Sequence, residues 1–350
     1  MDTPTLRILD TISSHLGDSL SINQLTETIK ETCGTAHYAN IYRKLQELKK
    51  EGLLNLNPVG RSSVINLNFQ NYLLIDLLAE MEIEKKMESL KGRNDLFLFL
   101  TEMEKSLNDT CSIKSISSIN PAKNIKLNRI EFLFLLRKTA HYLDETVRVY
   151  REMQKLQNKY NLRIDSLILD EDDFSDLARS NEINPLREAL VKKTVFFCPQ
   201  AFWSEIKRIA EKTEIRTIRT ETEPSSISDL DLINNLGRFG YREFGANIEQ
   251  GKSYCIEYLT TALLVLGDAR RPGAIPVILA KNAFRSNLLA FLSQKFGTAG
   301  KLLGLLRTLH HIKPSREIGE TMTILETLNV KEIPADERSI LRKMRLYNAT

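Results

Sequence analysis

The sequence lacks the patterns that bind structural zinc, direct export or span a membrane. Its four cysteines are far apart and none forms a CxxC pair, so a zinc ribbon is not expected. The first residues show no basic start followed by an apolar core, and no run of about 18 apolar residues occurs. We therefore expect no secretory signal, no membrane contact and a cytoplasmic chain with reduced cysteines.

The chain also has little net charge. Lys and Arg number 49 against 45 for Asp and Glu, which gives a net charge of +4. The distribution of charge is therefore more informative than its total. With 350 residues, of which 42% are hydrophobic, the chain can form two or three domains with buried cores.

The first 68 residues predict three helices followed by a hairpin. Ser21 can cap the second helix, which Gly34 ends, and Thr35 is expected to cap the third, AHYANIYRKLQELKKEG. Two short extended runs follow within residues 53–67, around a turn that carries Arg61. The expected unit is thus three helices with a basic-tipped hairpin.

This order of elements resembles a winged-helix domain. The segment IYRKLQELKKEGLL is similar to the recognition helix and first wing strand of many winged-helix transcription regulators. The resemblance implies double-stranded DNA as a partner, with the start of the third helix at the base edges and cations on phosphates. The residues expected to contact DNA are Thr35, His37, Tyr38, Asn40, Arg43, Lys44 and Arg61. The alternative is a protein-interaction module, which winged-helix domains also form.

Residues 93–212 predict a small layer of strands and helices. The order helix, strand, strand, helix, strand resembles the small nucleotidyltransferase domains that are paired with winged-helix domains in some archaeal proteins. In that family a Gly-Ser turn approaches the triphosphate, and three acids hold Mg²⁺ ions against it.

The residues at these positions depart from the family pattern. Ser117 and Ser118 stand at the expected turn, without a glycine. Glu131 and Asp165 match the second and third acids, but Arg129 occupies the place of the first. An arginine close to two acids would pair with them, so we expect a vestigial site without catalysis, metal or cofactor. Mg²⁺ and a nucleoside triphosphate are expected only under the alternative, an active nucleotidyltransferase acting on nucleic acid or protein.

The C-terminal third is predicted to be helical and contains a long stretch without acids. No Asp or Glu occurs between residues 269 and 316. The cations of this second basic patch include Arg270, Arg271, Lys281, Arg285, Lys295, Lys301 and Arg307. A helical stretch with cations alone suggests a second nucleic-acid or other anionic partner. The alternative is pairing with the acids of the middle domain or of the linker.

These patterns predict an α+β fold that is mostly helical. The expected parts are a winged-helix domain (1–68), a connecting helix (69–92), a degenerate nucleotidyltransferase-like domain (93–212), a linker (213–228) and a basic helical domain (229–350). We expect a DNA-binding protein that regulates transcription, with the degenerate domain as scaffold or ligand sensor. The connecting helix is a candidate for pairing two copies into a homodimer. An interaction module that binds no nucleic acid is the remaining alternative.

Overall fold

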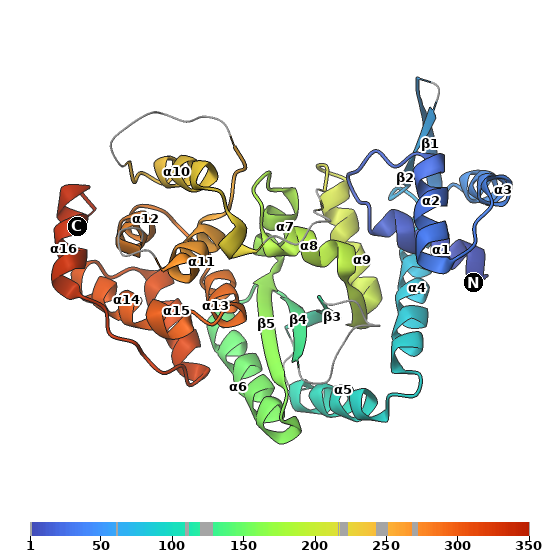
Figure 1. Cartoon of the computed structure of the whole chain (residues 1–350). Helices are drawn as coiled ribbons and strands as arrows, with labels where there is room; N and C mark the ends of the chain where they lie inside the picture. The colour runs from blue at the N-terminus through green and yellow to red at the C-terminus, as the bar shows by residue number, and fades with distance from the viewer. Residues whose placement is uncertain are drawn as a thin grey trace.

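The computed structural model describes residues 2–60, 62–108, 112–119, 129–215, 217, 223–242, 251–267 and 272–349. The fold is α+β and 62% helical, with sixteen α-helices and two small sheets among the described residues. Figure 1 shows the N-terminal helices at one end, the larger sheet in the middle and the C-terminal helices at the other end. The predicted fold class, α+β and mostly helical, is confirmed.

The N-terminal part contains three helices and a hairpin. These elements are α1 Thr3–Ser13, α2 Ile22–Cys33, α3 Tyr38–Lys50, β1 Leu54–Val59 and β2 Ser62–Leu67. The two strands are antiparallel, and Ser21, directly before α2, forms an isolated bridge with Val64 of β2. The hairpin is therefore joined to the α1–α2 connection as well as to α3.

The predicted caps hold for α2 and fail for α3. Ser21 Oγ accepts a hydrogen bond from the Gln24 amide at 3.3 Å, and Gln24 Oε1 accepts one from the Ser21 amide at 2.9 Å. Thr35 does not cap α3, because the backbone stays extended through His37, which occupies the N-cap position without a side-chain hydrogen bond. The role expected for Thr35 as a cap is therefore wrong.

The middle part is built on a four-stranded sheet with the order β5–β4–β3–β6. Its strands are β3 Ile113–Ser118, β4 Arg129–Leu136, β5 Arg163–Asp170 and β6 Thr194–Phe197. β4 and β5 are parallel and are joined by α6 Tyr142–Tyr160, whereas β3 is antiparallel to both of its neighbours. Every residue of β4 after Arg129 is buried. Since successive side chains point to opposite faces, both faces of this strand are covered.

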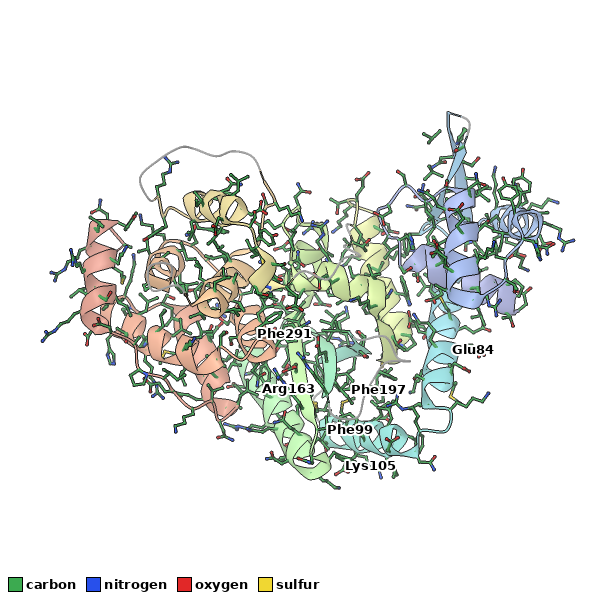
Figure 2. The ribbon with its side chains drawn as sticks, in the orientation of Figure 1. Glu84, Phe99, Lys105, Arg163, Phe197 and Phe291 are labelled. Atoms are coloured by element: carbon green, nitrogen blue, oxygen red, sulfur yellow. The ribbon has the colours of Figure 1, made fainter. Side chains whose placement is uncertain are left out.

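Helices cover the sheet from both sides. They are α4 Leu73–Leu90, α5 Asn94–Leu107, α7 Glu171–Arg179, α8 Pro185–Lys192 and α9 Pro199–Ala210. Phe99 of α5 stacks on Phe132 of β4 with ring centroids 6.1 Å apart, and Figure 2 labels Phe99 at this position below the sheet. The expected connecting helix is α4. It packs against β6 and α9, and the buried Glu82 carboxylate accepts a hydrogen bond from the Val195 amide at 3.0 Å.

The C-terminal part is helical. Its elements are η2 Pro224–Ser226, α10 Asp229–Arg238, α11 Ile256–Leu266, η3 Pro272–Ala274, α12 Ile275–Lys281, α13 Ser286–Lys295, α14 Ala299–Ile312, α15 Arg316–Thr327 and α16 Glu337–Leu346. α13 packs on β5, so this part is attached at the β5 edge of the sheet. In the expected linker, Ile215 is buried and the Thr217 hydroxyl donates to the Leu16 carbonyl at 3.1 Å. None of the described helices has the length and apolar character needed to cross a membrane.

Candidate functional site

The two acids of the middle part face each other across neighbouring strands. Glu131 on β4 and Asp165 on β5 are direct partners in the parallel register. Their exposed fractions are only 4% and 1%. A buried carboxylate is costly unless it is paired, so the groups around these acids decide what the site can do.

Cations engage all four carboxylate oxygens of this acid pair. Arg129 lies 3.2 Å from Glu131 Oε1 and 2.9 Å from Asp165 Oδ2. Lys295 Nζ lies 3.0 Å from Glu131 Oε2, and Arg163 Nε lies 3.2 Å from Asp165 Oδ1. The predicted pairing of Arg129 with both acids is confirmed. Mg²⁺ needs carboxylate oxygens as ligands, so these residues do not fit a magnesium site.

The last turn of α13 lies against the two arginines that pair with these acids. Arg163 donates to the carbonyls of Gln294 and Lys295 at 2.5 and 3.0 Å, and Arg129 donates to the Lys295 carbonyl at 3.5 Å. The two guanidinium groups thus satisfy carbonyls at a helix C-terminus, where cations are favoured. Figure 2 labels Arg163 on β5 and Phe291 on α13, the two elements that meet here. We call the set Arg129, Glu131, Arg163, Asp165 and Lys295 the acid clamp.

The two serines do not form a turn. Ser117 and Ser118 lie inside β3, fully buried, and pair with β4 on one side and β6 on the other. The Ser117 hydroxyl has no hydrogen-bond partner among the described residues. The expected placement of this pair at a phosphate-binding turn is wrong, because the strand continues through both residues and its backbone groups belong to the sheet.

The exposed face of α3 carries most of the predicted DNA-contacting residues. Ile41, Leu45 and Leu48 are buried, and Arg43 lies on the side opposite to this stripe. Arg43 is exposed and makes no ion pair with a described residue. His37, Tyr38 and Asn40 are also exposed around the start of the helix, as is Thr35 before it. Arg61 lies outside the described residues.

Lys44 differs from Arg43 because it is held by acids. Its Nζ lies 2.9 Å from Asp2 and 3.2 Å from Glu47. Hydrogen bonds from Thr5 and then from Lys44 lower the pKa of Asp2 to about 2. Hydrogen bonds to Asp2 and then to Glu47 raise the pKa of Lys44. Lys44 therefore fastens α3 to the start of α1, and its charge is already compensated.

One feature of α3 was not anticipated from the sequence. The rings of Tyr38 and Tyr42 stack with centroids 6.0 Å apart and planes inclined by 16°. Both rings remain accessible, with exposed fractions of 48% and 44%. The four-residue spacing of the two tyrosines on a predicted helix was the signal that could have identified this pair.

Three of the five described cations of the second basic patch, Arg285, Lys295 and Arg307, are paired with acids. Arg285 lies 3.0 Å from Asp173 and Lys295 belongs to the acid clamp, so these two fit the alternative of pairing with acids of the middle domain. Arg307 pairs with Glu326 at 2.7 Å and also with Glu332. Lys281 and Lys301 are exposed, and a nucleic-acid role for them stays a prediction. Arg270 and Arg271 lie outside the described residues.

A hollow of about 1470 Å³ lies away from the acid clamp. It is lined by α1, α4 and the connection from α8 to β6, with Leu6, Met81 and Lys193 among its residues. Burial lowers the pKa of Lys193 to about 8, and its Nζ donates to the Leu190 carbonyl at 3.1 Å while lying over the Trp203 ring. These contacts hold Lys193 within the protein.

Within the part of the chain that the structure describes, no group of three or more His, Cys, Asp or Glu side chains is arranged to hold a metal ion. The chain matches no protein family model, no curated protein and no solved structure. The function must therefore be inferred from the residues themselves.

Proposed function

We propose that this protein binds double-stranded DNA through α3 and the β1–β2 hairpin and acts as a transcription regulator. The observation that carries the proposal is the exposed face of α3, where Arg43, beside Asn40, His37 and Tyr38, has no acid partner among the described residues. Three helices followed by a hairpin, with a short bridge from the α1–α2 connection to β2, is the element order of a winged-helix domain.

The chemistry of this face suits the major groove. An α-helix fits into that groove, where arginine can bind guanine and asparagine can bind adenine through two hydrogen bonds each. Lys49 and Lys50 are exposed at the other end of α3 and are placed to contact phosphates. The hairpin, which packs beside α3, would reach the neighbouring backbone.

In this proposal the middle part is a degenerate nucleotidyltransferase-like domain that serves as a scaffold. The order of its strands and helices supports the resemblance, and the acid clamp supports the loss of catalysis. Glu131 holds α13 directly through Lys295, and Asp165 holds it through Arg163, which donates to the Gln294 carbonyl. The hollow beside α1 and α4 supports a role in sensing a ligand, because an occupant would contact both the N-terminal and the middle parts.

The proposal is tested by selecting preferred sites from a library of random DNA duplexes with the full-length chain. Asn40→Ala is expected to relax the preference at one base pair, with a loss of about 1–3 kcal/mol of discrimination. Lys105→Ala on α5 is the matched control, since Lys105 is exposed and lies far from α3 in Figure 2. Selection of no common site by the wild-type chain, or the same site preference in Asn40→Ala, would contradict the proposal.

A further inference from the structure

The last helix, α16, is held to the C-terminal part by one face only. Ile340 and Met344 are buried, one turn apart. Tyr347, directly after the helix, stacks on the buried Tyr241 with ring centroids 4.4 Å apart. Lys313 also donates to the Ala349 carbonyl at 3.2 Å. These contacts fix which side of α16 faces away from the protein.

Three arginines form a stripe on the opposite face. Arg338, Arg342 and Arg345 have the spacing i, i+4 and i+7, which places them on one side of the helix. All three are exposed, and none pairs with an acid among the described residues. We call these three residues the arginine stripe.

Cations elsewhere on the surface are arranged differently. On α6, Arg151, Lys155 and Lys159 also follow one exposed face, but Lys155 lies 2.6 Å from Glu152 and Lys159 lies 2.5 Å from Glu102. Among the cations before α15, Arg285, Lys295 and Arg307 lie beside acids. The arginine stripe, by contrast, places three cations along one helix face without an acid partner among the described residues.

Helix stability accounts for only one end of the stripe, because Arg345 lies in the last turn of α16, where the helix dipole favours a cation. Arg338 lies in the first turn of α16, where the helix dipole disfavours a cation. An uncompensated row of guanidinium groups is suited to a row of phosphates, which arginine binds through paired hydrogen bonds. The contact would follow the backbone of a nucleic acid and would not depend on its sequence.

The two cationic faces lie at opposite ends of the molecule. Figure 1 shows α3 at the outer edge of the N-terminal part and α16 at the outer edge of the C-terminal part, with the sheet between them. The acid clamp joins the C-terminal part to this sheet. Two such faces, kept apart by the body of the protein, can each receive its own duplex.

We propose that the arginine stripe of α16 is a second, sequence-independent contact for double-stranded DNA, and that the chain bridges two duplexes. Both the bridge and the choice of duplex DNA as the partner at α16 rest on the proposed function of α3. Duplex DNA is the partner because the opposite end presents a helix suited to the major groove.

Bridging is measured by fixing one duplex to beads and counting a fluorescent second duplex that the full-length chain retains. Binding of the full-length chain to the bead-bound duplex is recorded in the same samples. The wild-type chain is expected to retain the second duplex, and Arg338→Ala/Arg342→Ala/Arg345→Ala is expected to retain at least tenfold less. This triple variant should still bind the bead-bound duplex through α3, with the salt slope of that contact unchanged. The matched control Arg151→Ala/Lys155→Ala/Lys159→Ala removes the same charge and should bridge normally.

A lysine triple, Arg338→Lys/Arg342→Lys/Arg345→Lys, keeps the charge and should preserve most of the bridging. Melting curves followed by circular dichroism verify that each variant is folded. Failure of the wild-type chain to bridge, or normal bridging by the alanine triple, would overturn the inference. The second result would also identify a dimer that bridges through two copies of α3. A failure of the proposed function is distinguished by a separate measurement. If α3 does not bind DNA, Arg43→Ala will leave binding to a single duplex unchanged.

Discussion

Replacing Lys295 by methionine removes one cation from the acid clamp and keeps a side chain of similar length. The exposed fractions of the two side chains that meet here are 14% for Lys295 and 6% for Glu131. Breaking a buried ion pair by removing one partner costs about 3–5 kcal/mol. Because Arg129 still contacts the other oxygen of Glu131, we expect about 2–4 kcal/mol for Lys295→Met.

A double-mutant cycle measures the interaction energy between Glu131 and Lys295 apart from their contacts with other residues. In Glu131→Met/Lys295→Met both charges are absent, and two apolar side chains of suitable volume remain. The double variant is expected to be more stable than the sum of the single changes predicts, by about 0.5–3 kcal/mol.

The assay is hydrogen exchange of β4, β5 and α13, read against thermal melting of the whole chain, since a chain with several parts need not unfold in one step. Lys301→Met is the control, because Lys301 is exposed on α14. If Lys295→Met behaves like Lys301→Met, or if the two single changes are simply additive, the reasoning about the acid clamp is refuted.

Three further changes test other parts of the structure. Gly304→Ala should destabilise the protein by about 1–3 kcal/mol or more, because a Cβ there would lie 2.0 Å from the Ile333 carbonyl oxygen. Gly319→Ala, whose Cβ would meet nothing within 4 Å, should instead raise the melting temperature slightly. Burial and then Asp170 raise the pKa of Asp173 from 3.8 to about 6, so the folded state holds a proton that the unfolded state has released. Stability should therefore fall as the pH rises from about 4 to about 6, and Asp173→Asn should remove this pH dependence in melting experiments. Incubation with labelled nucleoside triphosphates and Mg²⁺ should give no incorporation into nucleic acid or protein, and incorporation that depends on the acid pair would restore the enzymatic alternative.

Local patterns predicted the elements of the middle part well. The runs IEFLFLL and LRIDSLIL are β4 and β5, and the acid-rich start of α7 is a helix N-terminus, where Asp170 accepts a hydrogen bond from the Asp173 amide at 2.8 Å. The apolar periodicity of residues 286–296 and 299–309 likewise corresponds to α13 and α14. Each of these segments carries its own local pattern of apolar or capping residues. Its assignment as helix or strand therefore did not depend on contacts far away in the sequence.

The C-terminal third was predicted to be helical, but α10 and α16 were not delimited within it. α16 buries only Ile340 and Met344 within its bounds, and α10 buries only Leu232, Asn235 and Leu236. These helices are held by neighbours that lie far away in the sequence.

Only part of the acid clamp could be predicted from the sequence. The pairing of Arg129 with Glu131 could be predicted, because residues two positions apart on one strand lie on the same face of the sheet. Lys295, by contrast, meets Glu131 across 164 residues, and no local pattern contains that contact. The same limit applies to the second basic patch, since the acids that pair with Arg285 and Arg307 lie on other helices.

The proposed DNA contact at α3 is tested most directly by a salt titration of binding between the full-length chain and a double-stranded DNA fragment. The account predicts that log affinity falls linearly with log salt, and that Arg43→Ala weakens binding and reduces the slope by about 0.9. Lys105→Ala should leave both quantities unchanged, and Lys44→Ala should act mainly on stability because its charge is paired with Asp2 and Glu47. No binding at low salt, or an Arg43→Ala titration that coincides with the wild-type curve, would contradict the account.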